Sequence, residues 1–192
     1  PDATIREGTL AGFTAVASDP GSDLLTYTWD FGDGTATSVG DSVEHTYADN
    51  GVYTLTLTVT DPSDGSDTAT EEITVVNVAP VFTALVGDSN GDLGESLLFQ
   101  GTAFDIAGAA DELLWTWDFG DGSTPEVAYG LTSVSHIWTE VGGFVLTVTL
   151  DDEDGGTAEQ TIGVQIDNPA PTASEISGDA SLDEGETGSW AL

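Results

Sequence analysis

An internal duplication is the feature that most limits the folds open to this chain. Residues 27–35, with the sequence YTWDFGDGT, recur as residues 115–123, with the sequence WTWDFGDGS, at an offset of 88. Three later segments recur at an offset of 91, so the second copy carries a three-residue insertion. A repeat of about 90 residues predicts two tandem copies of one small domain.

The hydrophobic pattern inside each copy has a period of two. Leu25, Tyr27, Trp29 and Phe31 alternate with polar residues, and the apolar residues of segment 53–60 alternate with threonines. Such alternation is typical of half-buried strands. Turn-forming Asp-Gly and Asp-Pro sequences separate these segments, and no segment indicates a helix. About seven short strands in each copy predict an all-β, Greek-key sandwich.

The charge of the chain is strongly one-sided. It has 35 acidic residues and one basic residue, Arg6, which give a net charge of −34. Nucleic acid is excluded as a partner, because phosphate binding needs Lys and Arg. No apolar run is long enough to cross a bilayer, so we expect no direct membrane insertion. Repulsion at this charge density opposes folding unless solvent ions or bound cations offset it.

The sequence offers little for catalysis. It has no cysteine, and its two histidines, His45 and His136, occupy equivalent places in the two copies. Equivalence in a repeat indicates a structural role. No pair of carboxylates stands out among the acidic residues as a general acid and base for glycoside hydrolysis. We therefore predict that the chain is not an enzyme.

The aromatic residues divide into core positions and one surface candidate. Trp29 and Trp117 occupy the same place in the two copies, and Trp115 shares their strand face, so all three are expected in the core. Trp138 is expected to be the most exposed tryptophan and thus a candidate for binding carbohydrate. The segment from Asp49 to Tyr53 has the form of a tyrosine corner, in which the phenol bonds to nearby backbone.

These motifs resemble the PKD repeat, the polycystic kidney disease family. Both copies carry Trp-Asp-Phe-Gly-Asp-Gly, then His-x-Tyr or His-x-Trp, then an aromatic strand after glycine. The resemblance implies tandem immunoglobulin-like sandwiches of the kind found in cell-surface proteins, archaeal surface layers and appendages of secreted hydrolases. It also implies calcium, which some bacterial members bind. We expect one PKD-like domain in residues 1–78, with an incomplete first strand, and a second in residues 79–168. Residues 169–192 would begin a third domain or form a tail donated to another subunit.

Acidic loops are the candidate calcium sites, since calcium takes six to eight oxygen ligands. In an Ig-like sandwich, the loops before the Trp strand and before the last strand lie where the chain enters. Carboxylates of loops 105–112 and 151–154 should therefore meet the Asn77 amide at the domain junction. The alternative is a solvated acidic surface, as in salt-adapted proteins. The predicted ligands are Asn77, Asp105, Asp111, Asp151, Asp152 and Asp154 at the junction, Asp88, Asn90, Asp92 and Glu95 in a second loop, and Asp19, Asp61 and Asp64 in the first domain.

We therefore expect a non-catalytic, extracellular structural module. It would be a calcium-rigidified repeat of a large cell-surface or filament-forming protein with a role in adhesion. Its partners would be calcium ions and either neighbouring repeats or further copies bound head to tail. The alternative is an appendage of a secreted hydrolase that binds polysaccharide or protein, which a row of exposed aromatic residues would favour.

Overall fold

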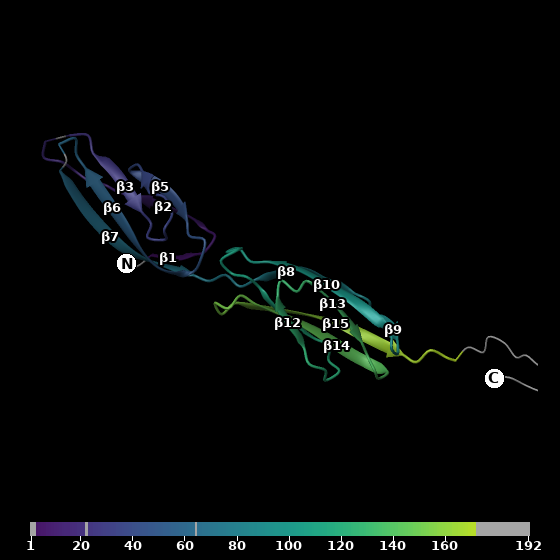
Figure 1. The fold of residues 1–192 in the computed structure, drawn as a ribbon. Helices are drawn as coiled ribbons and strands as arrows, with labels where there is room; N and C mark the ends of the chain where they lie inside the picture. The colour runs from purple at the N-terminus through teal and green to yellow at the C-terminus, as the bar shows by residue number, and fades with distance from the viewer. Residues whose placement is uncertain (1–2, 22, 64, 172–192) are drawn as a thin grey trace, which may run out of the picture.

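The computed structural model describes residues 3–21, 23–63 and 65–171. These residues form fifteen strands and no helix, which confirms the all-β prediction. Two elongated domains lie end to end, domain 1 in residues 3–76 and domain 2 in residues 81–167 (Figure 1). The linker, Asn77–Pro80, joins them. The predicted ligand Asp64, and residues 172–192 of the expected third unit or donated tail, lie outside the described residues.

Domain 1 is a sandwich of a five-stranded sheet and a two-stranded sheet. The larger sheet has the order β1-β7-β6-β3-β4, in which β1 runs parallel to β7, and the smaller sheet pairs β2 with β5. The long central pair β6 and β7 is in register from Gly51 to Thr60. The strands are β1 Ala3–Arg6, β2 Leu10–Thr14, β3 Thr26–Asp30, β4 Ser38–Val39, β5 Ser42–Thr46, β6 Gly51–Thr60 and β7 Ser66–Val76.

Domain 2 repeats this plan with one strand more. Its five-stranded sheet has the order β12-β11-β14-β15-β9, and its second sheet has the order β13-β10-β8. The parallel pair β9 and β15 corresponds to β1 and β7. The strands are β8 Val81–Gly87, β9 Asn90–Asp92, β10 Ser96–Phe104, β11 Leu114–Asp118, β12 Glu126–Tyr129, β13 Ser133–Ile137, β14 Gly142–Asp151 and β15 Thr157–Asp167.

The two smaller sheets differ at one edge. In domain 2, β10 pairs with β13 on one side and with β8 on the other. In domain 1, β2 pairs with β5, and no strand among the described residues lies on its other side. A groove of about 210 Å³ opens beside β2 and is lined by Phe13, Trp29, Leu55 and Ala69 among others.

Each domain has its own hydrophobic core, and the tryptophans fill both. Trp29 is 4% exposed, and Trp115 and Trp117 are 2% and 0% exposed, which confirms their predicted burial. The prediction for Trp138 is wrong, because this residue is also fully buried. It follows β13, where Val134 and His136 already face inward, and it packs against aromatic rings of domain 2.

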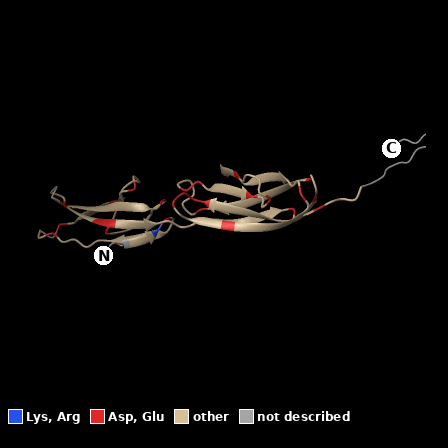
Figure 2. Cartoon of the chain, turned by 90° about the horizontal axis from the view of Figure 1, so that it is seen from below, with Lys and Arg blue, Asp and Glu red and all other residues tan. Residues whose placement is uncertain are grey.

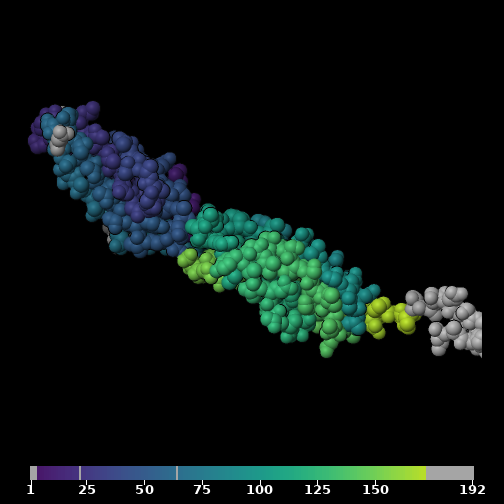
Figure 3. Space-filling view, in the orientation of Figure 1, coloured from purple at the N-terminus to yellow at the C-terminus, as the bar shows by residue number. Residues whose placement is uncertain are grey.

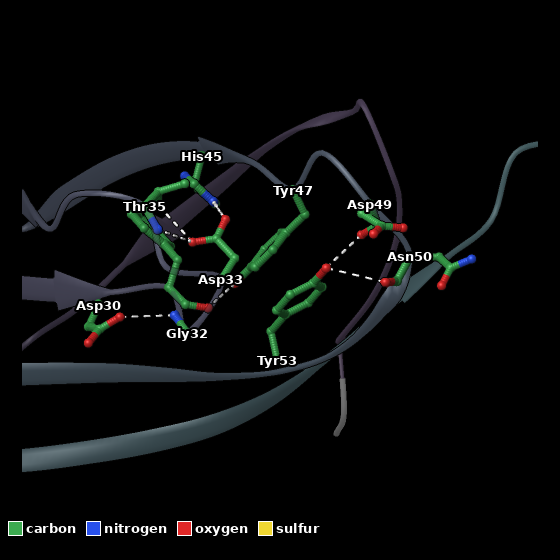
Figure 4. Close-up of polar contacts among 10 residues, drawn as sticks. Asp30, Gly32, Asp33, Thr35, His45, Tyr47, Asp49, Asn50 and Tyr53 are labelled. Carbon is green, nitrogen blue, oxygen red and sulfur yellow. Dashed lines mark hydrogen bonds and ion pairs between the residues drawn. The ribbon is translucent and has the colours of Figure 1, made fainter. Parts of the chain in front are cut away.

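A histidine–aspartate pair fastens the Gly-Asp-Gly turn of each domain to the opposite sheet. In domain 1, His45 Nε2 lies 2.7 Å from Asp33 Oδ2 (Figure 4). The imidazole stacks on Phe31 with ring centroids 3.8 Å apart. In domain 2, His136 and Asp121 make the same 2.7 Å contact. The two histidines thus lie in equivalent structural arrangements.

The tyrosine corner of domain 1 forms as the sequence predicts. The Tyr53 hydroxyl donates to the backbone carbonyl of Asp49 at 2.9 Å and lies 3.2 Å from that of Asn50 (Figure 4). These bonds fix the turn that carries the Asp49 side chain. Phe144 occupies the corresponding place in domain 2 and has no hydroxyl to make them.

Candidate metal centre

The junction between the domains is built from loops of both. Domain 1 contributes the turn after β1 and the turn before β6, while domain 2 contributes loops 105–113 and 152–156. Acidic residues gather in the loops where the domains meet (Figure 2). The space-filling view shows that the domains touch at this narrow junction (Figure 3). Any cation held there would therefore have ligands from two domains within reach.

The linker is fixed to both domains by direct hydrogen bonds. The Val78 backbone N–H donates to Glu7 Oε1 of domain 1 at 2.5 Å. The Asn77 amide donates through Nδ2 to Asp152 Oδ2 of domain 2 at 2.9 Å. Asp152 Oδ1 in turn accepts from the backbone N–H groups of Asp154 and Gly156. Asp152 therefore orients the linker and closes its own loop.

Close backbone approaches also shape the junction. A Cβ on Gly156 would lie 2.7 Å from the Cα of Ala79, so glycine lets the linker pass over this loop. Gly8 has a φ of +65°, and a Cβ there would lie 2.5 Å from Cγ1 of Ile106 in domain 2. Only glycine takes up this conformation without strain, and it leaves room for the neighbouring domain.

Three carboxylates are buried where the domains meet. Glu7 of domain 1 is 0% exposed, and Asp105 and Asp111 of domain 2 are 8% and 2% exposed. Their oxygens come within 4.8 Å of one another, and those of Asp49, Asp111 and Asp154 form a second such group. Carboxylates are rarely buried without a cationic or hydrogen-bonding partner, because the charged form loses its hydration.

Most of the buried oxygens at the junction have no such partner. Asn77 Oδ1, Glu7 Oε2, Asp105 Oδ2 and both carboxylate oxygens of Asp111 are buried and accept no hydrogen bond. Five orphaned acceptors in one place require an explanation, since buried polar atoms are normally satisfied. No lysine or arginine pairs with these carboxylates in the part of the chain that the structure describes.

Burial, together with repulsion between neighbouring carboxylates, raises the pKa of two carboxyl groups in the cluster. Burial raises the pKa of Glu7 despite the opposing hydrogen bond from Val78, and nearby carboxylates raise it further. Burial, followed by repulsion from the other four carboxylates of the two groups, raises the pKa of Asp111 from 3.8 to about 6. Both shifts have the sign expected of like charges held close together without a counter-ion. A bound divalent cation would remove this penalty.

The structure brings together part of the predicted ligand set. Asn77, Asp105, Asp111, Asp152 and Asp154 all lie at the junction, as the topology predicts. Asp152 is already occupied by three hydrogen bonds. Asp151 lies just before it and bonds to the backbone N–H of Glu153, outside both groups.

The second predicted loop is arranged differently from the expectation. Residues 90–92 form the short strand β9, which pairs with β15. Glu95 folds back to accept from the backbone N–H of Asp92, and Asp88 is exposed. None of these four residues belongs to a group of converging carboxylates within the described ranges.

Asp19 and Asp61 of domain 1 lie in loops that correspond to the junction loops of domain 2. They line an open groove of about 490 Å³ at the end of domain 1 away from the linker. Asp19 accepts from the Asp23 backbone, and Asp61 accepts from Ser63 and Gly65. Neither joins a carboxylate group in the described part of the chain.

Sequence reasoning missed two residues of the cluster, Glu7 and Asp49. Both belong to the end of domain 1 where the chain leaves, whereas the prediction considered the end of domain 2 where it enters. A signal for each was present. Glu7 precedes Gly8 in a turn directly after a strand, and Asp49 begins the tyrosine-corner motif. In a tandem array, those turns must face the following domain.

Comparison with known proteins gives a family. A model of the PKD domain matches residues 1–75 and 77–166. The chain is 33% identical over 138 residues to Polycystin-1 of Homo sapiens, covering 67% of this chain and 3% of that protein. It is 26% identical over 160 residues to Collagenase ColA of Clostridium perfringens, covering 76% of this chain and 14% of that protein.

The chain thus spans a small part of each of these relatives. Among solved structures, the PKD1 domain of Vibrio anguillarum Epp is similar, with 25% identity and a TM-score of 0.36 over 49% of this chain and 100% of that one. The family model covers nearly all of both domains, and each carries the Trp-Asp-Phe-Gly-Asp-Gly turn with its histidine–aspartate pair. The chain therefore belongs to the PKD domain family.

Proposed function

We propose that this chain is a non-catalytic, extracellular structural module, in which calcium bound at the domain junction holds two PKD domains in a fixed orientation. The observation that carries the proposal is the group of buried junction oxygens that accept no hydrogen bond. Calcium suits this group, because its ligands are carboxylate and amide oxygens from several loops. Both domains supply ligands, so binding would stiffen the junction.

The charge of the whole chain supports calcium as the ion. The chain has a net charge of −34 and a single basic residue, Arg6, which forms no ion pair with the junction carboxylates among the described residues. Extracellular modules bind calcium with dissociation constants of about 0.1–1 mM. At tenfold that concentration, each bound ion adds about 1.4 kcal/mol to the free energy of unfolding. For domains of this size, each kcal/mol added to the free energy of unfolding raises the melting temperature by roughly 4–8 °C.

The test is thermal unfolding of the 192-residue chain in EDTA, in calcium, and in sodium chloride at matched ionic strength. We expect calcium to raise the melting temperature well above the value in sodium chloride. A solvated acidic surface would respond to both salts alike, because general screening depends on ionic strength. Equal melting temperatures in the two salts would reject the calcium centre.

A second candidate, an appendage of a secreted hydrolase, is favoured by the similarity to a collagenase. The two candidates differ in the parent protein rather than in the module. Trp138, the tryptophan expected at the surface as a carbohydrate-binding residue, is buried. It therefore gives no support to carbohydrate as the ligand. Pull-down with insoluble polysaccharides and with collagen, set against a calcium-free control, distinguishes a binding appendage from a spacer.

We extend the proposal to self-association at the edge of β2 that no described strand covers, because an unpaired edge strand offers backbone hydrogen bonds to another strand. In sequence, residues 172–178 follow the Asn-x-Ala-Pro motif as β8 does at an offset of 91, so a second copy carries a matching segment. Sedimentation of the full chain and of a chain ending at Asn168 tests this. Polymers of the full chain alone would support it, and monomers of both would reject it.

A further inference from the structure

The five carboxylates at the junction form two groups rather than one. Glu7, Asp105 and Asp111 bring oxygens within 4.8 Å of one another and are all buried. Asp49, Asp111 and Asp154 form a second group, which is more exposed. Asp111 is the only member that the two groups share. Within the described residues, no group unites all five.

One calcium ion cannot serve both groups. Protein oxygens lie 2.3–2.6 Å from calcium, so all ligands of one ion lie within about 5 Å of each other. An ion bound among Glu7, Asp105 and Asp111 would leave Asp49 and Asp154 outside its shell. It would also leave three of the five negative charges uncompensated in a partly buried place. A second divalent ion reduces that excess to one.

The Asp111 side chain is suited to join two ions. Both of its carboxylate oxygens are buried and accept no hydrogen bond, although the residue is only 2% exposed. The other two buried carboxylates have one orphaned oxygen each, because Glu7 Oε1 accepts from Val78 and Asp105 Oδ1 accepts from Ala107. Asp111 is therefore the one buried member with an oxygen free for each ion.

We propose that the junction binds two calcium ions that share Asp111. The inner ion is held by Glu7, Asp105 and Asp111, and the outer ion by Asp49, Asp111 and Asp154. This inference rests on the proposed calcium centre and adds to it the number of ions and their division of ligands. Asn77 Oδ1, which is buried and unpartnered, is a further oxygen available at the junction.

Each ion connects the two domains independently. Domain 1 gives Glu7 to the inner ion and Asp49 to the outer ion, and domain 2 gives each ion two carboxylates. The linker and one such bridge hold the domains at two points and still allow rotation about the line between them, whereas a second bridge at a different point fixes their orientation. The stiffness of the junction therefore depends on both ions.

The number of ions is measured by native mass spectrometry and isothermal titration calorimetry of the full chain in calcium. We expect wild type to bind two junction ions, Asp49→Asn and Glu7→Gln to lose one each, and Asp111→Asn to lose both. Glu126→Gln, a neutralised exposed residue on β12, is the control and should bind as wild type does. Circular dichroism and the melting curve in EDTA show that each variant folds.

The outcomes separate the two proposals. If Glu7→Gln, Asp49→Asn and Asp111→Asn all bind the same number of ions as wild type, the junction holds no calcium and the proposed function fails. If Asp49→Asn, Glu7→Gln and Asp111→Asn all lose the same single ion, the calcium centre stands and the pair of ions is rejected. Loss of one, one and two ions by these variants supports the shared arrangement.

Discussion

Replacing Asp111 by asparagine should have opposite effects with and without calcium. In EDTA at pH 7, the Asp111 carboxylate is ionised among four others, and its pKa of about 6 exceeds the ordinary 3.8. A raised pKa favours folding at low pH, and this contribution is lost as the pH rises through 6. One pKa unit corresponds to 1.36 kcal/mol, so ionisation costs the folded state about 3 kcal/mol. Asparagine removes that cost, and the variant should be more stable than wild type in EDTA.

Calcium should reverse this order. At a calcium concentration a hundredfold above the dissociation constant, each ion adds about 2.7 kcal/mol to the stability of wild type. The stability that two ions add to wild type therefore exceeds the roughly 3 kcal/mol that Asp111→Asn gains by losing the buried charge. The variant lacks the shared ligand, and its stability should change little when calcium replaces EDTA.

The assay is urea unfolding at pH 7, followed by tryptophan fluorescence, for wild type and Asp111→Asn in EDTA and in calcium at matched ionic strength. Glu126→Gln is the control, because it removes the same charge from an exposed position on β12 and should respond to calcium as wild type does. The reasoning is refuted if Asp111→Asn is less stable than wild type in EDTA, or if calcium stabilises both by the same amount.

Three further predictions concern the cores and turns. Tyr53→Phe removes the hydrogen bonds to the Asp49 and Asn50 carbonyls and should cost about 1 kcal/mol in urea unfolding, and equal stability of Tyr53→Phe and wild type would contradict the tyrosine corner. Trp138→Ala should cost about 3–5 kcal/mol, because the side chain is fully buried, and a change below about 1 kcal/mol would mean that it lies at the surface. Burial opposes but does not outweigh hydrogen bonds from Ser123 and His136, which lower the pKa of Asp121 to about 2. The stability that this carboxylate contributes is therefore present above pH 4 and lost as the pH falls towards 2, and a chain with His136→Gln should lose less over that range.

The fold could be predicted from the sequence because its determinants are local. The alternation around Trp29 and Trp117 sets the strand faces, and the Gly-Asp-Gly turns mark where those strands end. The predicted exposure of Trp138 is wrong, although the same alternation of buried and exposed residues applies to it. Val134 and His136 face inward from β13, so the next residue in that alternation, Trp138, continues into the core, while Ile137 is 50% exposed.

The candidate site could be predicted only in part, because two of its five carboxylates depend on how the two domains meet. The topology of a single sandwich was enough to predict that Asp105, Asp111 and Asp154 lie at the end of domain 2 where the chain enters. Glu7 and Asp49 come from the other domain, and their approach depends on the linker bonds of Val78 and Asn77. Spacing along the chain does not show which acidic residues converge, and within the described residues none of the acidic residues of segment 88–95 joins a group of converging carboxylates.

The central claim is that calcium fixes the orientation of the two domains, and it is tested most directly by a distance distribution across the junction. The chain has no cysteine, so spin labels can be placed at Ser42→Cys on β5 and Ser135→Cys on β13, both exposed. Double electron–electron resonance should give a narrow distribution in calcium and a broad one in EDTA, and Asp111→Asn should remain broad in both. Distributions of equal width in calcium and EDTA for the wild-type sequence would contradict the account.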